Sequence, residues 1–542
     1  MPTKYVVVLG SLLSGLGKGV VVASIAKLLS VRGIRALPLK FDGYLNYDCG
    51  TMNPFRHGEV FVLDDKSEVD MDFGTYERFL GTSMKGEFSL TGGKIFSAIM
   101  EKERRGDFLG SDVQFVPHVT NYIVDYLKGV SSRNELDVLI IEVGGTVGDI
   151  ENHYFLEAMR QLAMKEDVAF IDVTYVPELG SVGEQKTKPT QIALRNIMQL
   201  GIQPDVIVCR TEHGLSDAAK AKIAMFANLD NGAVIDDHDV GNIYALPVHL
   251  ADQGLDKYIM ARLGLRDRTS PSALKKSMAE WSGLCKAMEN ERAPGVCIAI
   301  VGKYTKLHDA YASIKEALYH AAAKSSVRLE LKWVDSEKLE DKSLDIGEVF
   351  SDVNGILVPG GFGRRGIEGM IRAISYARTT GVPYLGICLG MQLMAVEFAR
   401  DVCHLAKANS TEFDAGTRYN VIDLLPGQAG ASIKGGTMRL GLQAARVRRG
   451  TLAYKAYGTG IVHERHRHRY ELNSSYEKTL TSKGLVISAV TSGGLAEIIE
   501  WASSFGIGTQ AHPELRSNPM RPAPLFSAFI SAAKAQMAAR KT

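Results

Sequence analysis

Short apolar runs recur along the first half of the chain and alternate with longer segments of helical character. The runs at 5–9, 138–143 and 206–209 are almost uninterrupted, and glycine-rich or polar turns follow them. Runs of this length and composition are typical of buried strands. Strands that alternate with helical segments predict a parallel sheet covered by helices.

The amino-acid composition changes between this half of the chain and the next. The stretch 269–294 is polar, carries lysine and glutamate, and is framed by Ser-Pro and Ala-Pro-Gly. A buried-strand pattern then restarts, with runs at 296–301, 355–358, 384–387 and 485–490. We therefore predict an α/β protein with a doubly wound parallel sheet in residues 1–269, a linker at 270–294 and a second α/β domain at 295–542.

Composition limits the classes of partner. Among the 542 residues, Lys and Arg number 63 and Asp and Glu 61, so no overall basic field favours nucleic acid. No apolar run approaches the roughly 18 residues that cross a membrane, and the N-terminus lacks the pattern of a signal peptide. Six widely spaced cysteines without C-x-x-C spacing fit a reducing compartment. We expect a cytoplasmic protein with small-molecule partners, no nucleic acid and no membrane.

A glycine-rich loop at 10–19 follows the first apolar run. Small residues allow backbone N–H groups to surround phosphate oxygens, and Lys18 adds a full charge at the start of a helix. The loop differs from a strict Walker A motif, because Leu12 and Gly19 replace the usual glycine and hydroxyl residue. Ser11 or Ser14 could supply the hydroxyl. A plain strand-to-helix turn with a solvated lysine is the alternative.

Acidic and basic residues elsewhere in the first half suit a nucleotide triphosphate. Asp72 closes an acidic stretch, and Glu142 ends a strong strand, where ligands of parallel sheets gather. Two carboxylates together with substrate phosphates can hold Mg²⁺. The lysines of 186–191 could neutralise further phosphate charge. Each of these features alone could equally be a solvated loop.

A second glycine-framed motif lies at 386–390. Cys388, with glycines two residues before and after it, has the pattern of a nucleophile at a strand-to-helix turn. His512 and Glu514 supply a base and a carboxylate that orients it. The glycines after Pro359 can offer N–H groups to an oxyanion. Separately, Cys388 could be a core thiol and His512 a buried histidine; together they indicate nucleophilic catalysis.

These motifs resemble known families. Segment 386–392 with His512-Pro513-Glu514 resembles the class I glutamine amidotransferase domain, which releases ammonia from glutamine through a cysteinyl thioester. The first half is similar to the synthetase domain of the CTP synthase family, through segments 14–19, 57–62, 102–107, 142–151 and 186–191. The resemblance implies a P-loop-type amidoligase domain that binds ATP and UTP, ATP-dependent amination of UTP at position 4, and ammonia channelled from Cys388.

The resemblance also implies site residues. For ATP they are Gly15, Leu16, Gly17, Lys18, Gly19, Val20, Lys40, Asp72, His238, Asp239 and Val240. For UTP, or CTP as feedback inhibitor, they are Ser14, Asp149, Ile150, Glu151, Lys186, Thr187, Lys188, Pro189, Thr190, Gln191 and Lys222. For glutamine they are Gly361, Leu389, Gly390, Met391, Gln392, Glu412, Arg469 and Tyr470. Asp72 and Glu142 would bind Mg²⁺, and the ammonia tunnel would pass Pro54, His57 and Val60.

Further implications concern regulation and assembly. The family pattern implies activation by GTP, through segment 435–441. It also implies a homotetramer, and it does not decide whether the tetramers form filaments. The Arg/His tract at 464–471 is interpreted as a substrate-facing strand end. Departures from the family pattern at Ser11, Gly43, 152–154 and 178–182 affect expected nucleotide affinity and CTP inhibition more than catalysis. Departures at Ala511 and Leu515 affect the packing of the triad, which we still expect to work. The alternatives are another ATP-dependent amidotransferase and a non-catalytic scaffold.

Overall fold

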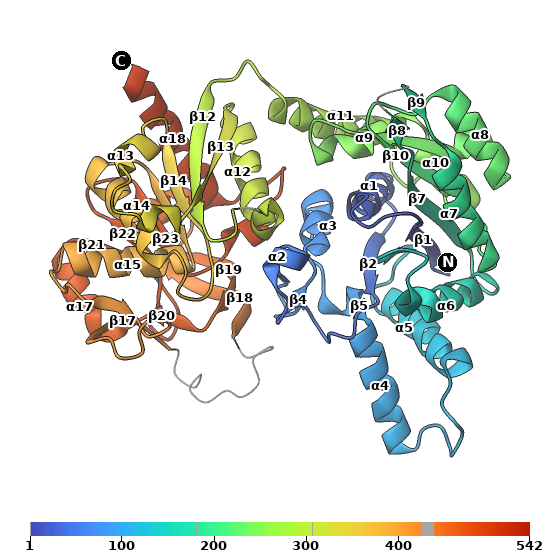
Figure 1. Cartoon of the computed structure of the whole chain (residues 1–542), viewed down its shortest axis with the longest axis horizontal. Coiled ribbons are helices and arrows are strands. Elements are labelled where there is room, and N and C mark those ends of the chain that lie inside the picture. The colour runs from blue at the N-terminus through green and yellow to red at the C-terminus, as the bar shows by residue number, and fades with distance from the viewer. Residues whose placement is uncertain (1, 180–182, 306, 425–437, 542) are drawn as a thin grey trace. The chain divides into compact units, whose positions relative to one another are not determined.

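The computed structural model describes residues 2–179, 183–305, 307–424 and 438–541 (Figure 1). Residues 180–182 of one predicted departure and residues 435–437 of the predicted GTP segment lie outside these ranges. Contacts divide the chain into two units. The first comprises Met1–Cys49 and Thr75–Cys285, and the second Gly50–Gly74 and Lys286–Thr542.

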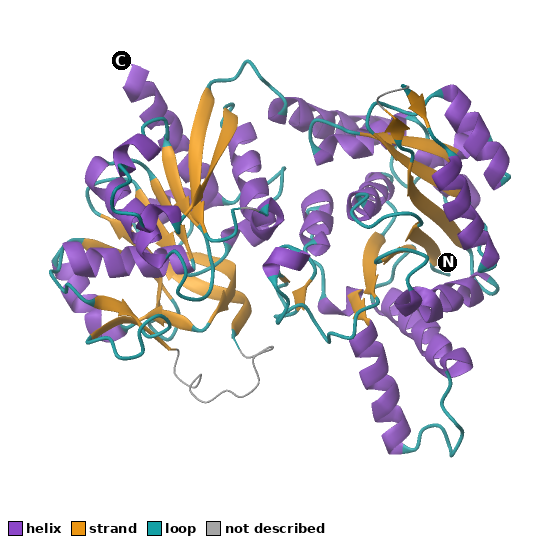
Figure 2. Cartoon of the chain, viewed as in Figure 1, coloured by secondary structure: helices purple, strands orange, loops and turns teal. Residues whose placement is uncertain are grey.

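The first unit is built on a seven-stranded parallel sheet with helices packed around it (Figure 2). Its strands, in spatial order, are β11 (Val234–His238), β10 (Val206–Thr211), β7 (Val168–Tyr175), β1 (Lys4–Gly10), β6 (Val138–Val143), β2 (Ala36–Asp42) and β5 (Ser89–Thr91). Both neighbours of β1 pair with it in parallel. The chain leads from β1 to β2 on one side of the sheet and from β7 to β10 on the other. The carboxyl ends of the neighbouring strands β1 and β7 therefore form a topological switch point, where ligands bind.

The connecting helices account for the segments between these strands. They are α1 (Lys18–Val31), α3 (Asp72–Leu80), α4 (Gly92–Arg105), α5 (Thr120–Arg133), α6 (His153–Ala163), α7 (Lys188–Gln199) and α8 (Asp217–Ala227). The first turn of α3 falls in the second unit. Two further helices, α9 (Leu246–Asp252) and α10 (Leu255–Arg262), follow the last strand. All residues of β6 are buried, as expected of a strand covered on both faces. The doubly wound parallel sheet expected from the sequence is thus observed.

The interval 270–294, expected to be a linker, is mostly helix. The helix α11 (Pro271–Met288) buries Trp281 and Cys285. The Trp281 indole donates to the Tyr244 carbonyl at 2.7 Å, and the Cys285 thiol donates to the same oxygen at 3.1 Å. Because these contacts are made within the first unit, most of this interval is an anchored element of that unit.

The second unit contains a nine-stranded sheet in which only one half is parallel. The parallel strands are β13 (Arg328–Asp335), β12 (Gly295–Gly302), β14 (Gly355–Val358), β15 (Tyr384–Ile387) and β23 (Gly506–Thr509). The antiparallel strands that continue the sheet are β22 (Ala496–Trp501), β21 (Leu485–Val490), β18 (Arg439–Val447) and β19 (Ile461–His468). The second α/β domain is therefore present, with an antiparallel extension that the apolar runs did not reveal.

Helices and a small sheet complete this unit. The helices are α12 (Ala312–Lys324), α13 (Ile346–Val349), α14 (Ile367–Thr380), α15 (Leu389–Asp401), α16 (Leu452–Tyr457), α17 (Ser474–Ser482) and α18 (Pro524–Lys541). A three-stranded sheet is formed by β16 (Ala408–Ser410), β17 (Tyr419–Leu424) and β20 (Tyr470–Leu472). Within the described residues, no helix is both long and apolar enough to span a membrane.

Residues 50–74 belong to the second unit although they lie early in the chain. They form α2 (Pro54–His57) and a hairpin of β3 (Phe61–Val62) and β4 (Glu68–Val69). The Glu59 carboxylate accepts bonds from the backbone N–H of Ser313, at 3.0 Å, and from its hydroxyl. This segment therefore crosses over to pack with residues some 250 positions further along the chain.

Candidate active sites

The strongest candidate nucleophile is Cys388, which joins β15 to α15. Its backbone has φ 52° and ψ −98°, a conformation that non-glycine residues rarely adopt. Its N–H donates to the Thr509 carbonyl at 2.7 Å. A Cβ on Gly390 would lie 2.2 Å from the Val358 carbonyl oxygen. The glycine spacing thus reflects close backbone packing around a strained, fixed turn.

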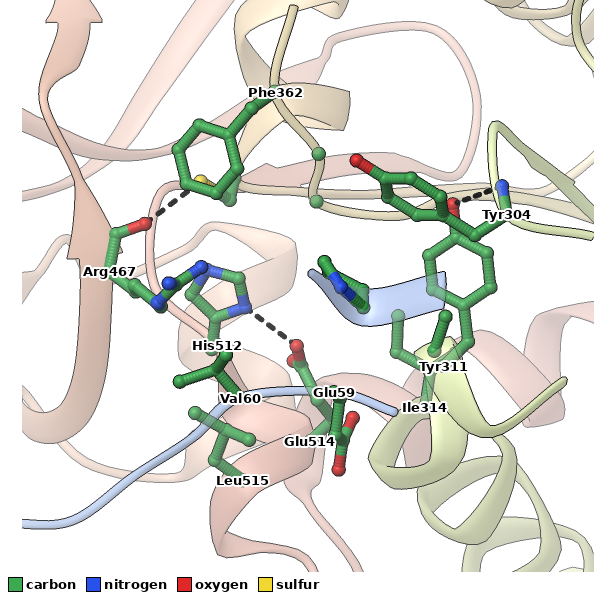
Figure 3. A pocket seen from close by; sticks show the side chains of 15 residues that line it. Glu59, Val60, Tyr304, Tyr311, Ile314, Phe362, Arg467, His512, Glu514 and Leu515 are labelled. Carbon is green, nitrogen blue, oxygen red and sulfur yellow. Dashed lines mark hydrogen bonds and ion pairs between the residues drawn. The ribbon is translucent and has the colours of Figure 1, made fainter. Parts of the chain in front are cut away.

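His512 and Glu514 lie next to this turn, as predicted. The His512 Nδ1 is 2.7 Å from the Glu514 Oε1 (Figure 3). The other ring nitrogen, Nε2, is buried and has no hydrogen-bond partner within the described part of the chain. A Cβ on Gly360 would be 3.0 Å from His512 Cε1 and 3.7 Å from Cys388 Cβ. The imidazole is therefore oriented by Glu514, with Nε2 left to exchange a proton with Cys388.

The surroundings of His512 favour its charged form. Burial disfavours a charged imidazole, but Glu514 and the Cys388 thiolate outweigh burial and raise the pKa of His512 to about 10. The protonated ring therefore stabilises the folded state. That contribution is complete below about pH 6.5 and is lost as the pH rises through about 10.

The substitution Glu514→Gln is expected to lower the pKa of His512 towards its ordinary value, because it removes the largest favourable charge beside the ring. NMR of the His512 imidazole across pH 6–10 measures this. The parent should stay protonated at pH 8, and the variant should lose its proton at lower pH. An unchanged midpoint would show that Glu514 does not set the charge of His512.

The predicted glutamine-binding residues surround the same turn. A Cβ on Gly361 would lie 3.4 Å from the Leu389 side chain, so these two residues are adjacent. Gln392 donates to the Tyr470 carbonyl at 2.8 Å, and Glu412 accepts from the Gly363 N–H at 2.8 Å. Gly390 and Met391 are buried in the first turn of α15, and Arg469 lies between β19 and β20. Leu389, Gly390, Met391 and Gln392 directly follow Cys388 on α15. That these residues, together with Gly361, Glu412, Arg469 and Tyr470, bind glutamine stays a prediction.

Sequence reasoning missed Gln510. This side chain is fully buried, donates from Nε2 to the Cys388 Sγ at 3.5 Å and accepts from Gln392 at 3.2 Å. It connects the nucleophile to the predicted substrate-binding residue. Its position two residues before His512, directly after β23 ends at Thr509, was the available signal.

The pocket around Cys388 includes residues from the 50–74 segment. Pro54, Glu59 and Val60 line it together with Cys388, Arg467 and His512 (Figure 3). Two of the three predicted tunnel residues thus lie at the nucleophile's pocket. The third, His57, is exposed on α2 and does not line the pocket.

The Arg/His tract differs from its interpretation as a substrate-facing strand end. Arg467 does line the pocket, but Arg465, His466 and His468 are at most 1 % exposed. Burial lowers the pKa of His468 to about 3, so its ring is neutral. Residues 464–466 of β19 are buried one after another, so both faces of this part of the strand are covered within the second unit.

In the first unit, the glycine-rich loop and the turn after β6 meet at Lys18. Gly15 and Gly17 have φ 77° and 83°, which favour glycine. Lys18 begins α1, and its ammonium donates to the Gly145 carbonyl. A Cβ on Gly10 would lie 2.6 Å from this ammonium nitrogen, so glycine makes room for the lysine. Two motifs far apart in the sequence therefore form one site.

The two serines of the loop have different surroundings. Ser11 is buried and donates to the Asp172 carboxylate at 2.8 Å. Burial raises the pKa of Asp172 to about 7, although Ser11 and Lys18 act in the opposite direction. Ser14 is exposed. The hydroxyl that a phosphate-bound cation needs is therefore better supplied by Ser14.

Carboxylates suited to a magnesium ion lie at the ends of neighbouring strands. Lys40 and Glu142 are register partners on β2 and β6, with Nζ and Oε1 4.0 Å apart. Asp42 ends β2, 4.0 Å from the same ammonium, and was not predicted. Glu142 also accepts from the Tyr76 hydroxyl. Hard oxygen donors of this kind, with substrate phosphates, fit Mg²⁺. Asp72 begins α3, and its pairing with Glu142 stays a prediction.

Asn152 fixes the turn that carries the predicted UTP residues. Its amide donates to the carbonyls of Gly144 and Thr146, at 2.8 and 3.1 Å. Asp149 accepts from the Thr146 N–H at 2.5 Å, whereas Ile150 and Glu151 are exposed. A Cβ on Gly43 would lie 2.6 Å from the Asn152 Oδ1. The departures at 43 and 152 are therefore neighbours, and the larger residue at 152 fits because residue 43 has no side chain.

Some residues of the predicted segment 186–191 make hydrogen bonds within the fold, and others line a pocket. Thr190 donates to the Tyr175 carbonyl at 3.0 Å, and Gln191 donates to the Thr187 hydroxyl at 3.1 Å. Lys186 pairs with Glu184 at 2.5 Å, and Lys188 and Pro189 begin α7. Thr187 and Lys222 line one pocket. That pocket is the part of the predicted UTP site that the first unit brings together.

The predicted ATP-binding residues His238, Asp239 and Val240 lie at the end of β11 and directly after it. The His238 ring is 2.6 Å from the Asp236 carboxylate, and the His249 ring is 3.4 Å from it. Asp239 pairs with Arg210, and Val240 follows it in the same loop. Asp236, His238 and His249 have ligand chemistry for a metal ion. Asp236 also accepts from Thr211 and from the Leu215 N–H, both at 2.9 Å, so the cluster is a closed hydrogen-bond network.

Comparisons with known proteins agree with both halves. The family described as CTP synthase N-terminus matches residues 4–265, and glutamine amidotransferase class-I matches residues 306–532. The fold and sites thus define a glutamine-hydrolysing ligase that joins a synthetase domain to a class I amidotransferase domain. CTP synthases of Thermococcus gammatolerans and Pyrococcus furiosus are each 48% identical over 539 residues. The chain belongs to the CTP synthase family.

The aligned lengths support this assignment. The two relatives match 98% of this chain and 99% and 98% of their own lengths. The solved glutaminase domain of Trypanosoma brucei CTPS with bound acivicin is 38% identical, covering 44% of this chain and 94% of that chain, with a TM-score of 0.42. The two family matches and the two CTP synthases confirm the predicted family and enzyme class, and the sheets described above confirm the α/β fold class.

Proposed function

We propose that this protein converts UTP to CTP with ATP and with ammonia released from glutamine at Cys388. The observation that carries the proposal is the fixed Cys388 turn beside an imidazole that Glu514 orients at 2.7 Å, in a chain of the CTP synthase family. A buried, strained nucleophile with an adjacent oriented base is the arrangement that acyl transfer requires.

The glutaminase steps follow from this geometry. The Cys388 thiolate attacks the side-chain amide carbon of glutamine, and the N–H groups of Gly361 and Leu389 stabilise the oxyanion. His512 gives its proton to the departing ammonia, leaving a thioester on Cys388. His512 then takes a proton from water as water attacks the thioester; the C–S bond breaks, which yields glutamate and restores the Cys388 thiolate beside protonated His512. Gln510, through its bond to Sγ, orients the sulfur in both steps.

The synthetase steps use the first unit. The γ-phosphoryl group of ATP passes to the 4-oxygen of UTP, and ammonia then displaces phosphate to form CTP. Lys18 and Lys40 stabilise negative charge on the transferring group, and the turn at 144–152 with Thr187 and Lys222 binds UTP. Glu142 and Asp72 would hold a magnesium ion, which supplies charge neutralisation for the phosphates when bound.

Regulation, assembly and location extend the proposal. GTP acts as activator and CTP as feedback inhibitor in the UTP site, as the family pattern implies. A homotetramer is supported by large apolar side chains that are exposed on α4 and on the residues after it, including Met100, Leu109 and Phe115. The free thiols of all six cysteines suit the cytoplasm.

The activity is tested with the purified full-length protein, ATP, UTP and Mg²⁺. CTP formation is followed by chromatography with either glutamine or ammonium chloride as nitrogen donor. We expect CTP from both donors and glutamate in equal amount to CTP when glutamine is used. A folded protein that forms no CTP with either nitrogen donor would contradict the proposal. A protein that aminates another acceptor instead of UTP would be a different amidotransferase.

A further inference from the structure

Two arginines of β19 each contact one catalytic residue and one carboxylate of the 50–74 segment. Arg465 accepts from the His512 N–H at 2.8 Å through its backbone carbonyl. Its side chain donates from Nε to the Asp64 carboxylate at 2.6 Å and from Nη1 to the Leu515 carbonyl at 3.1 Å. The Arg465 side chain is 1 % exposed. The backbone next to His512 is therefore held through a fully buried guanidinium.

Arg467 repeats this arrangement at the nucleophile. Its backbone carbonyl oxygen lies 3.9 Å from the Cys388 Sγ, the contact drawn as a dashed line in Figure 3. Its Nε donates to the Glu68 carboxylate at 2.8 Å, and its Nη2 donates to the Gly50 carbonyl at 3.2 Å. Glu68 is 3 % exposed. Since residues two apart on a strand point to the same face, both arginines reach the same segment.

The carboxylates that receive these bonds are themselves fixed. Asp64 and Glu68 flank the turn of the β3–β4 hairpin, and the Asp64 carbonyl accepts from the Leu442 N–H on β18 at 3.1 Å. Gly441 has φ 75°, and a Cβ there would lie 2.8 Å from the Lys66 nitrogen. The hairpin therefore packs directly on the backbone of β18, next to β19, and both arginines bond to its carboxylates.

The two ion pairs are costly to break because their charges are buried. Removing one partner of a buried ion pair leaves an uncompensated charge, which is strongly unfavourable. The Arg467 guanidinium also lies 5.3 Å from the centre of the Phe362 ring, in the loop that carries Gly361. The hairpin, β19 and the loop beside the nucleophile therefore form one connected network around the reacting atoms.

We propose that Arg465 and Arg467 are positioning residues that tie the 50–74 segment to His512 and Cys388, so that this segment sets the geometry of glutamine hydrolysis. The proposal rests on the proposed roles of Cys388 and His512. The segment lies within the match to the synthetase family, at 4–265, and continues directly into α3, whose first residue is Asp72. A part of the chain assigned by sequence to CTP synthesis thus holds the ammonia-producing site in its active arrangement.

The test uses Glu68→Gln in the full-length protein, because Glu68 does not line the pocket and the change preserves its shape. We expect kcat for glutamate formation, measured with ATP and UTP present, to fall about 10-fold or more with little change in KM, since a displacement of about 1 Å can reduce the rate about 100-fold. The rate of Cys388 alkylation by iodoacetamide should change in parallel. Ammonia-dependent CTP formation should remain at the parent level.

A double-mutant cycle assigns the effect to the pair. Arg467→Gln should reduce kcat, and adding Glu68→Gln to it should have no further effect, because the pair is already broken. Glu397→Gln is the matched control: it breaks a buried pair of the same unit, with Arg378 at 2.6 Å, and should leave hydrolysis within twofold of the parent. Asp64→Asn should lower kcat in the same way. It should also alter the pH dependence of kcat, because Asp64 bonds Arg465 and the Arg465 carbonyl accepts from the His512 N–H.

Some results would overturn the proposal. Hydrolysis by Glu68→Gln and Asp64→Asn within twofold of the parent would do so, as would independent, additive effects of Glu68→Gln and Arg467→Gln. An equal loss in Glu397→Gln would show a general loss of stability instead of positioning. Failure of the proposed function is distinct, because it would appear as glutamine-dependent activity that survives loss of Cys388 itself.

Discussion

Replacing Cys388 with alanine is expected to abolish CTP formation from glutamine and to leave CTP formation from ammonia at the parent level. Alanine removes the sulfur that forms the thioester, and no other group at the turn replaces it, so glutamine-dependent activity should fall by roughly 1,000-fold or more. The backbone of the turn is held by the Thr509 carbonyl and by the glycines around it. The fold should therefore survive the change.

Both nitrogen donors are compared in one assay. Cys403→Ala is the control, since Cys403 is another free thiol of the same unit and its Sγ contacts the Thr479 carbonyl instead of a catalytic group. That variant should retain activity with both donors. Loss of ammonia-dependent synthesis in a folded Cys388→Ala protein, or survival of glutamine-dependent synthesis, would refute the division of chemistry between the two units.

Local motifs explain why much of the glutaminase site could be predicted. Cys388, His512 and Glu514 lie within short segments. The close packing that requires glycine at position 390 appears in the sequence as the glycine spacing around Cys388. The same holds for Lys18 and its glycine-rich loop. The sheet of the first unit was also predictable, because strands buried on both faces are continuously apolar.

Contacts between distant residues explain what could not be predicted. Asp64 pairs with Arg465 and Glu68 with Arg467 across about 400 positions, and neither carboxylate differs in its local pattern from a solvated loop acid. The 50–74 segment was therefore assigned with its neighbours in the sequence. The alternation of Arg and His on β19 suggested an exposed strand end because charge alone does not reveal burial. Gln510 was missed because its function comes from two contacts that only the folded chain forms.

Replacing Lys18 with methionine is expected to abolish CTP formation from either nitrogen donor while glutamine hydrolysis at Cys388 is retained. Lys18 is 8 % exposed, and its ammonium bonds the Gly145 carbonyl between the glycine-rich loop and the turn after β6. Methionine keeps the length of the side chain without its charge. Loss of one cation from a phosphoryl-transfer site lowers the rate by roughly 100- to 10,000-fold.

The matched control for Lys18→Met lies on the same helix. Lys27 is also part of α1, and its ammonium lies 4.2 Å from the centre of the Trp281 ring, away from the loop. Lys27→Met should retain synthesis with both donors. Glutamate and CTP are measured in parallel for both variants, and thermal unfolding verifies the fold. Ammonia supplied from solution bypasses the glutaminase. Normal CTP formation from ammonia in Lys18→Met would therefore exclude Lys18 from phosphoryl transfer. Loss of CTP formation with glutamine hydrolysis retained would place the charge of Lys18 at the step that activates UTP.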